Sequence, residues 1–328
     1  MGKDLNRRTF LKGMAAGAVV AMGTGLPQVA NGKDINSFAI FIDLTKCDGC
    51  EGREVPACVS ACREENKNNF PKPVKDMPKL FPRGKTENWS KKRDVTDRLT
   101  PYNWIFVQKA ELKINGKQKK VYIPRHCMHC DNPPCANLCP FGALKKMENG
   151  AVTTNFDLCM GGAKCRAVCP WHIPQRQSGV GLYLKFAPTL AGNGVMYKCN
   201  LCYDRITKGK EPACVEACPK KAMIFGPKEE MIALARRKAK EINGYLYGIS
   251  ENGGTNTIYL SDVPFKKLNM AIKKGPGRPH LGKVKNPLDD AGNIMKAFII
   301  APVAAAISGV AGAILGKKKS GKGEINNG

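Results

Sequence analysis

Fifteen cysteines in four groups constrain the fold of this 328-residue chain more than any other feature of its sequence. The groups are Cys47, Cys50, Cys58 and Cys62; Cys127, Cys130, Cys135 and Cys139; Cys159, Cys165 and Cys169; and Cys199, Cys202, Cys214 and Cys218. A C-x3-C ending recurs in all four groups, and a CxxC opening recurs in all but the third. This pattern is typical of iron–sulfur ligands, in which the last cysteine of one group serves a neighbouring cluster.

Two other uses of cysteine fit the pattern less well. A disulfide framework is the ordinary interpretation for an exported protein, but an odd number of cysteines leaves at least one thiol over. CxxC pairs also suit zinc. Neither alternative needs the C-x3-C ending or the proline that follows three of the groups. In the iron–sulfur interpretation, a CxxC turn presents two thiolates to one cluster, and the last cysteine, one helical turn further on, faces another.

The third group departs from the pattern in the stretch "CMGGAKCRAVCP", where Gly162 occupies the position of the second ligand. Three interpretations follow. The remaining cysteines could hold a 3Fe–4S cluster, or a 4Fe–4S cluster whose fourth iron takes a non-cysteine ligand, or the site could be empty. We expect the 3Fe–4S cluster, because every other ligand position of the motif is present.

The formal net charge of +26 raises the question of an anionic partner. Clusters ligated by thiolates carry roughly two negative charges each when oxidised, so part of the basic excess compensates them. The remainder suits acidic protein surfaces or anionic lipid. Nucleic acid is the competing partner for a basic chain, but the two ends of the sequence favour a membrane protein without a nucleic-acid partner.

The N-terminal segment, residues 1–30, has the features of an export signal. Arg7 and Arg8 are followed by Thr-Phe-Leu-Lys and then by an apolar, Gly- and Ala-rich run. This arrangement resembles the twin-arginine signal, which exports proteins that are already folded. A surface amphipathic helix is the alternative. Export after folding suits a protein whose clusters are built in the cytoplasm.

The segment 297–316 contains twenty consecutive residues without a charge, enough for a helix of about 30 Å that spans the hydrocarbon core. Lys317, Lys318 and Lys319 follow at once, and positive flanks lie on the cytoplasmic side. We therefore expect one transmembrane helix, a cytoplasmic tail at 317–328 and a body on the periplasmic side. The small residues Ser308, Gly312 and Gly316 share one face of this helix and suit packing against another membrane helix.

The blocks "HCMHCDNPPCANLCPFGALKK", "YKCNLCYDRI" and "EPACVEACPKKAMIFG" carry a more specific resemblance. Over residues 38–263 the chain resembles the four-cluster, ferredoxin-like electron-transfer subunits of respiratory oxidoreductases, such as formate dehydrogenase, dimethyl sulfoxide reductase and membrane-bound hydrogenase complexes. With its own signal and C-terminal helix, it is most similar to the HybA-type subunits of exported nickel–iron hydrogenases. The resemblance implies an α+β fold with two bacterial-ferredoxin-like two-cluster units in one body, plus the C-terminal transmembrane helix.

The resemblance also implies how the cysteines exchange between groups. Groups one and four form one unit, and groups two and three form the other. The implied ligand sets are Cys47, Cys50, Cys58 and Cys218; Cys199, Cys202, Cys214 and Cys62; Cys127, Cys130, Cys135 and Cys169; and Cys159, Cys165 and Cys139, with Gly162 at the missing position. The first three sets would hold 4Fe–4S clusters.

These units predict the domain organisation. The first unit comprises residues 38–62 and 195–226, and the second comprises 122–194. Residues 63–121 form an irregular insertion ending in a hairpin around Asn115-Gly116, which we expect to cover the second unit. Residues 227–296 form an extension, with a helix that starts at Pro227, a short strand and turn within 253–265, and a linker to the membrane from residue 273.

Two further inferences concern individual residues and the reaction. His126 and His129 flank ligands of group two and either tune a cluster by hydrogen bonds or fill space in the core. His172, beside Cys169, is not expected to replace the missing ligand. The sequence contains no legible nucleophile–base pair or nucleotide-binding loop, so we expect a non-catalytic electron carrier. Its expected partners are a periplasmic catalytic subunit, either nickel–iron hydrogenase or formate dehydrogenase or another molybdopterin enzyme, and a multi-span quinone-reactive membrane subunit.

Overall fold

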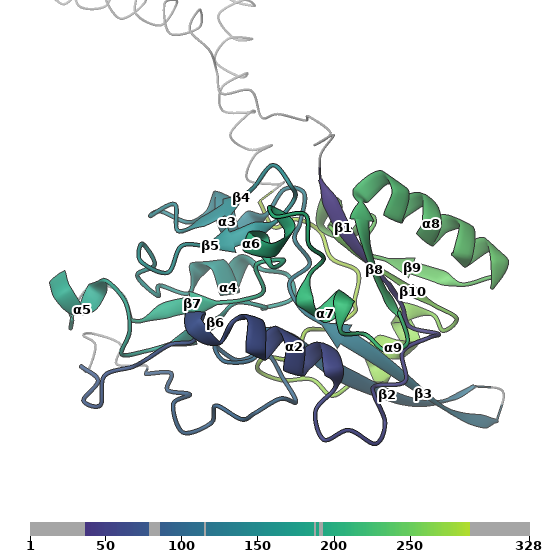
Figure 1. Cartoon of the computed structure of the whole chain (residues 1–328), viewed down its shortest axis with the longest axis horizontal. Coiled ribbons are helices and arrows are strands. Elements are labelled where there is room, and N and C mark those ends of the chain that lie inside the picture. The colour runs from purple at the N-terminus through teal and green to yellow at the C-terminus, as the bar shows by residue number, and fades with distance from the viewer. Residues whose placement is uncertain (1–36, 79–85, 115, 187, 190–192, 289–328) are drawn as a thin grey trace, which may run out of the picture. The chain divides into compact units, whose positions relative to one another are not determined.

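The computed structural model of the chain describes residues 37–78, 86–114, 116–186, 188–189 and 193–288 (Figure 1). The chain divides into residues 1–35 and Asn36–Gly328, and all described residues belong to the second unit. The expected signal at 1–30, the helix at 297–316 and the tail at 317–328 lie outside the described residues. No helix within the described ranges is both long and apolar enough to span a membrane.

A four-stranded sheet in the order β8-β1-β10-β9 forms one side of the described structure. Strand β1 (Phe38–Asp43) lies parallel to β10 (Thr257–Ser261) and antiparallel to β8 (Met223–Pro227), while β9 (Tyr245–Tyr247) is antiparallel to β10. The sheet therefore joins the start of the first unit to strands from the expected extension. The short strand expected within 253–265 is confirmed as β10.

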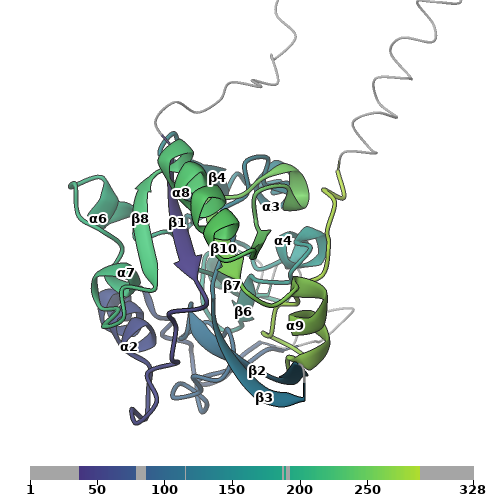
Figure 2. The same ribbon diagram turned by 90° about the vertical axis from the view of Figure 1, so that its right-hand side faces the viewer.

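Helix α8 (Lys228–Glu241) covers one face of this sheet, lying across β1, β8 and β10 (Figure 2). Pro227 precedes it, acidic residues occupy its first turn and lysines its last, an order that suits the helix dipole. Because side chains alternate along a strand, Ala39 and Phe41 of β1 pack against α8, whereas Ile40 and Ile42 face the opposite core. Most of the cysteines belong to that second core.

The predicted hairpin is confirmed as β2 (Phe106–Ile114) paired antiparallel with β3 (Lys117–Arg125). At Gly116 the backbone has a φ of +79°, a value that glycine adopts without strain. Helix α9 (Phe265–Ala271) packs on β2. The hairpin's position differs from the expectation, because Val107 and Pro124 line a cavity of the first unit, that of Cys47, rather than covering the second.

Shorter elements make up the rest of the described chain. The helices are α2 (Ala57–Glu65), α3 (Pro134–Asn137), α4 (Lys164–Val168), α5 (Tyr183–Phe186), α6 (Tyr203–Ile206) and α7 (Ala213–Glu216), with 3-10 turns η1 (Lys67–Asn69) and η2 (Glu251–Gly253). Strand β4 (Leu144–Lys146) pairs with β5 (Val152–Thr154), and β6 (Gln175–Gln177) pairs with β7 (Val195–Tyr197). These two ribbons lie on the same side of the described structure as α3 and α4 (Figure 1), which contain Cys135 and Cys165.

The expected linker is partly wrong, because residues 273–288 pack on the body. Leu281 is 1% exposed and belongs to the main core. The Arg125 guanidinium donates to the backbone oxygen of His280 at 2.8 Å, and the His280 ring lies 2.8 Å from the oxygen of Pro170. The Gly, Pro and Lys content of this segment predicted a linker without contacts to the body, but its few apolar residues are enough to pack it on the main core.

Candidate iron–sulfur sites

Four short helices carry the C-x3-C endings. Helix α2 contains both Cys58 and Cys62, one turn apart, whereas in α3, α4 and α7 the second cysteine follows the helix end. A proline stands directly before α2, α3 and α7, and its fixed φ suits the approach to a helix. In these three helices a buried cysteine, Cys58, Cys135 or Cys214, thus lies near a helix start defined by proline.

The CxxC turns are shaped by left-handed backbone positions. Gly49 and Cys50 have φ of +67° and +55°, and Leu201 and Cys202 have φ of +59° and +49°. Such turns gather successive N–H groups into a concave surface that attracts anionic sulfur. The Leu201 N–H donates to Cys199 Sγ at 3.4 Å in this way. Outside the turns, backbone N–H groups also donate to Cys218 Sγ and Cys159 Sγ, at 3.3 and 3.4 Å.

The cysteines meet around four cavities. Their lining cysteines are Cys47, Cys50, Cys58 and Cys218; Cys62, Cys199, Cys202 and Cys214; Cys127, Cys130, Cys135 and Cys169; and Cys139, Cys159 and Cys165 with Gly162. Each cavity thus combines cysteines from two groups. These are the sets that the family resemblance implies; their role as ligands stays a prediction.

The chemistry of these cavities fits a thiolate-bound cluster. None of the fifteen cysteines forms a disulfide. Burial raises the pKa of Cys47 and Cys135 to about 11 and that of Cys165, Cys169 and Cys199 to about 12. Because a buried thiolate is unstable without a compensating cation, these sites suit a group that brings iron among the sulfurs. Soft thiolate donors favour iron–sulfur clusters, zinc or copper(I). Because each cavity combines cysteines from two groups, iron–sulfur clusters are favoured among these three.

The structure leaves space for a side chain at position 162. A Cβ built on it would meet no atom within 4 Å, and its backbone is not in the left-handed region. The cavity therefore has room where a fourth thiol would stand. His172 lines a different cavity, of about 730 Å³, and its ring lies 3.1 Å from the oxygen of Arg166. This position agrees with the expectation that His172 does not replace the missing ligand.

Two polar residues near the sulfurs escaped the sequence analysis. Lys198 is 4% exposed, lines the cavity of Cys127, and donates its ammonium protons to the backbone oxygens of Val152 and Cys199. The Asn66 amide lies 3.7 Å from Cys62 Sγ. A buried ammonium compensates negative charge on neighbouring sulfurs. The only sequence signal for Lys198 was its position beside a CxxC turn, where a lysine is ordinarily exposed.

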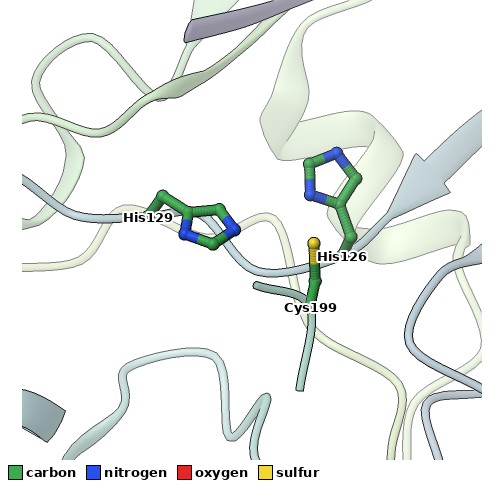
Figure 3. A group of neighbouring side chains, drawn as sticks. All are labelled: His126, His129 and Cys199. Atoms are coloured by element: carbon green, nitrogen blue, oxygen red, sulfur yellow. The ribbon is translucent and has the colours of Figure 1, made fainter. Parts of the chain in front are cut away.

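The two histidines that flank Cys127 are both buried. His126 is 1% exposed and His129 is 0% exposed. Burial lowers the pKa of His126 to about 4 and lowers that of His129 well below its usual value, so both rings are neutral at pH 7. Figure 3 shows their rings beside the sulfur of Cys199. One ring nitrogen of each and this sulfur all lie within 4.8 Å of one another.

Comparison with known proteins identifies the family of this chain. Residues 46–143 and residues 118–228 each match a family described as a 4Fe-4S dicluster domain. The chain is 31% identical over 308 residues to the Hydrogenase-2 operon protein HybA of Escherichia coli O157:H7, an alignment covering 81% of this chain and 84% of the relative. It is 32% identical over 265 residues to the Formate dehydrogenase-O iron-sulfur subunit of Escherichia coli strain K12, covering 79% and 74%. The chain therefore belongs to the family of iron–sulfur electron-transfer subunits of respiratory oxidoreductases.

Proposed function

We propose that this chain relays electrons through four clusters between a catalytic subunit, which we take to be a nickel–iron hydrogenase, and a quinone-reactive membrane subunit. The observation that carries the proposal is the assembly of the fifteen cysteines around four cavities, each shared between two groups. Iron–sulfur clusters supply one-electron redox chemistry, and the protein sets their spacing and surroundings.

The proposed ligand sets follow the cavities. Three cavities offer four cysteines each and would hold 4Fe–4S clusters. The fourth offers Cys139, Cys159 and Cys165, and three thiolates suit a 3Fe–4S cluster. A fourth 4Fe–4S cluster with a non-cysteine ligand at the iron facing Gly162 is the alternative.

The cavities also support an order for the relay. Cys58 and Cys62 lie four residues apart on α2 and face different cavities, so the helix links them over a rise of about 6 Å. His126 lines the Cys62 cavity and is adjacent in the chain to Cys127, which lines a second cavity with Cys130. The C-x3-C pairs of groups two and three join that cavity to the one at Gly162. The proposed path therefore starts at Cys47 and ends at Gly162, or runs in reverse.

The likeness to HybA supports hydrogenase as the catalytic partner. Formate dehydrogenase is the second candidate, favoured by the 32% identity to its iron–sulfur subunit. The paired arginines at positions 7 and 8 and the uncharged segment 297–316 support export and anchoring with the body on the periplasmic side. The small residues of that segment support a neighbouring membrane helix.

Gentle detergent extraction of the native complex tests the proposed partners. Affinity purification of the tagged full-length chain should bring out one catalytic subunit and one multi-span membrane subunit, identified by mass spectrometry. A nickel-containing partner supports hydrogenase, and a molybdenum-containing partner supports the second candidate. A chain that purifies alone and monodisperse would contradict the relay.

A further inference from the structure

The two buried histidines connect two of the cysteine sets. His126 and His129 flank Cys127 of one set, yet both lie beside Cys199 of another. Figure 3 shows the His129 ring pointing toward the sulfur of Cys199 and the ring of His126. Ring nitrogens from both sides of Cys127 therefore lie within 4.8 Å of the sulfur of a group-four cysteine, across the boundary between the two proposed ferredoxin-like units.

The hydrogen bonds of His129 show which nitrogen carries its proton. The Val152 N–H donates to His129 Nδ1 at 2.9 Å, so Nδ1 is an acceptor without a proton. Because Nδ1 accepts this hydrogen bond, the ring proton is on Nε2. That atom is buried and has no hydrogen-bond partner among the described residues. A buried N–H without an acceptor is costly, so an acceptor is expected close by.

His126 does not provide that acceptor. Its Nδ1 lies 2.8 Å from the backbone oxygen of Cys127, which can only accept, so Nδ1 carries the proton. In Figure 3 the His126 nitrogen nearer its Cβ faces His129, which leaves Nε2 on the far side of the ring. The remaining acceptor in the group is the sulfur of Cys199.

We propose that, when a cluster is bound by Cys62, Cys199, Cys202 and Cys214, His129 Nε2–H donates a hydrogen bond to the sulfur of Cys199 and thereby raises the reduction potential of that cluster. This inference rests on the proposed function. Reduction adds negative charge to the sulfurs, and a donor aimed at them stabilises the reduced form. His129 thus lies in the chain between two cysteines of one proposed cluster, Cys127 and Cys130, and its ring tunes the neighbouring cluster at Cys199.

Two substitutions test the acceptor role of Nδ1 and the donor role of Nε2 separately. His129→Asn keeps an acceptor near the place of Nδ1 for the Val152 N–H but removes the donor at Nε2, and asparagine tolerates the φ of +48° at this position. His129→Gln keeps a donor near the place of Nε2. The control is His172→Asn, because His172 has a similar φ of +52° beside a cluster cysteine but is exposed.

The measurement is a redox titration of the purified full-length protein, followed by electron paramagnetic resonance, with iron and sulfide counted in each sample. His129→Asn should shift the reduction equilibrium of one 4Fe–4S cluster about tenfold toward the oxidised form, about 59 mV for one electron. His129→Gln and His172→Asn should leave that cluster within about twofold of the unsubstituted protein.

Unchanged potentials in His129→Asn, at full iron content, would overturn the inference and leave the proposed function intact. If His129→Asn loses the cluster, His129→Gln decides: a native potential supports the donor and a lowered one contradicts it. Unsubstituted protein without iron or sulfide would contradict the proposed function itself.

Discussion

Gly162 is the residue at which the proposed chemistry of one site depends on the absence of a side chain. It lines a cavity with Cys139, Cys159 and Cys165, and a Cβ there would have open space. Neighbouring Gly161 differs, because a Cβ on it would lie 2.5 Å from the oxygen of Gly194. The first position can accept a new thiol without backbone strain, and the second cannot.

We predict that Gly162→Cys converts a three-iron cluster to a four-iron cluster. The added thiolate supplies the missing ligand, so the oxidised protein should lose the electron paramagnetic resonance signal of a 3Fe–4S cluster and gain one iron. The potential of that cluster should fall. Gly162→Ala is the matched control, since it adds the Cβ without the sulfur and should keep the signal. If the unsubstituted protein shows no such signal at full iron content, the three-iron assignment is wrong.

The sequence predicts the role of a residue when that role depends on local spacing, and not when it depends on contacts that form only on folding. The fifteen cysteines and the gap at Gly162 are visible because ligand spacing is local in sequence. Lys198 was not predicted, since its burial depends on Val152, a residue 46 positions away in the chain. Asn66 was not predicted although its contact with Cys62 is local, at a separation of four residues. The partner of His129 was equally hidden: Cys199 is close only after groups two and four have folded together.

At the scale of elements, strand β1 separates two packing layers. Phe41 is fully buried against α8, whereas Ile40 on the other face lines the cavity of Cys62. The sequence predicted the hairpin, α8 and β10, because each has local turn or capping signals. It did not predict that β10 would pair with β1, a contact between segments more than 200 residues apart, or that residues 273–288 would pack on the body.

We predict that Phe41→Ala destabilises the protein by about 3–5 kcal/mol, because it leaves a cavity between the sheet and α8. Cluster potentials should stay unchanged, since the side chain faces away from the cysteines. Denaturant titration followed by circular dichroism measures the first effect, and a redox titration measures the second. Phe186→Ala, at a side chain that is 75% exposed, should change stability by less than about 0.5 kcal/mol. Altered potentials in Phe41→Ala would mean that the two layers are coupled.

At the scale of the whole molecule, topology follows from the two ends, both outside the described residues. We predict that replacing Arg7 and Arg8 by lysine leaves the body in the cytoplasm, because the twin-arginine signal is lost. Deleting residues 297–328 should instead release the exported body into the soluble periplasmic fraction. Cell fractionation with antibody detection follows both variants. A reporter fused after Gly328 that proves periplasmic would contradict the single-span topology.

The most direct test of the four-cluster account is a count of iron and acid-labile sulfide in the anaerobically purified full-length protein, with its visible absorption spectrum. The account predicts brown protein with about 15 irons per chain and a 3Fe–4S signal in the oxidised state. Sixteen irons without that signal would contradict the three-iron cluster alone, and about 12 irons would favour an empty fourth site. Colourless protein that contains zinc, or no metal, would contradict the electron-transfer account as a whole.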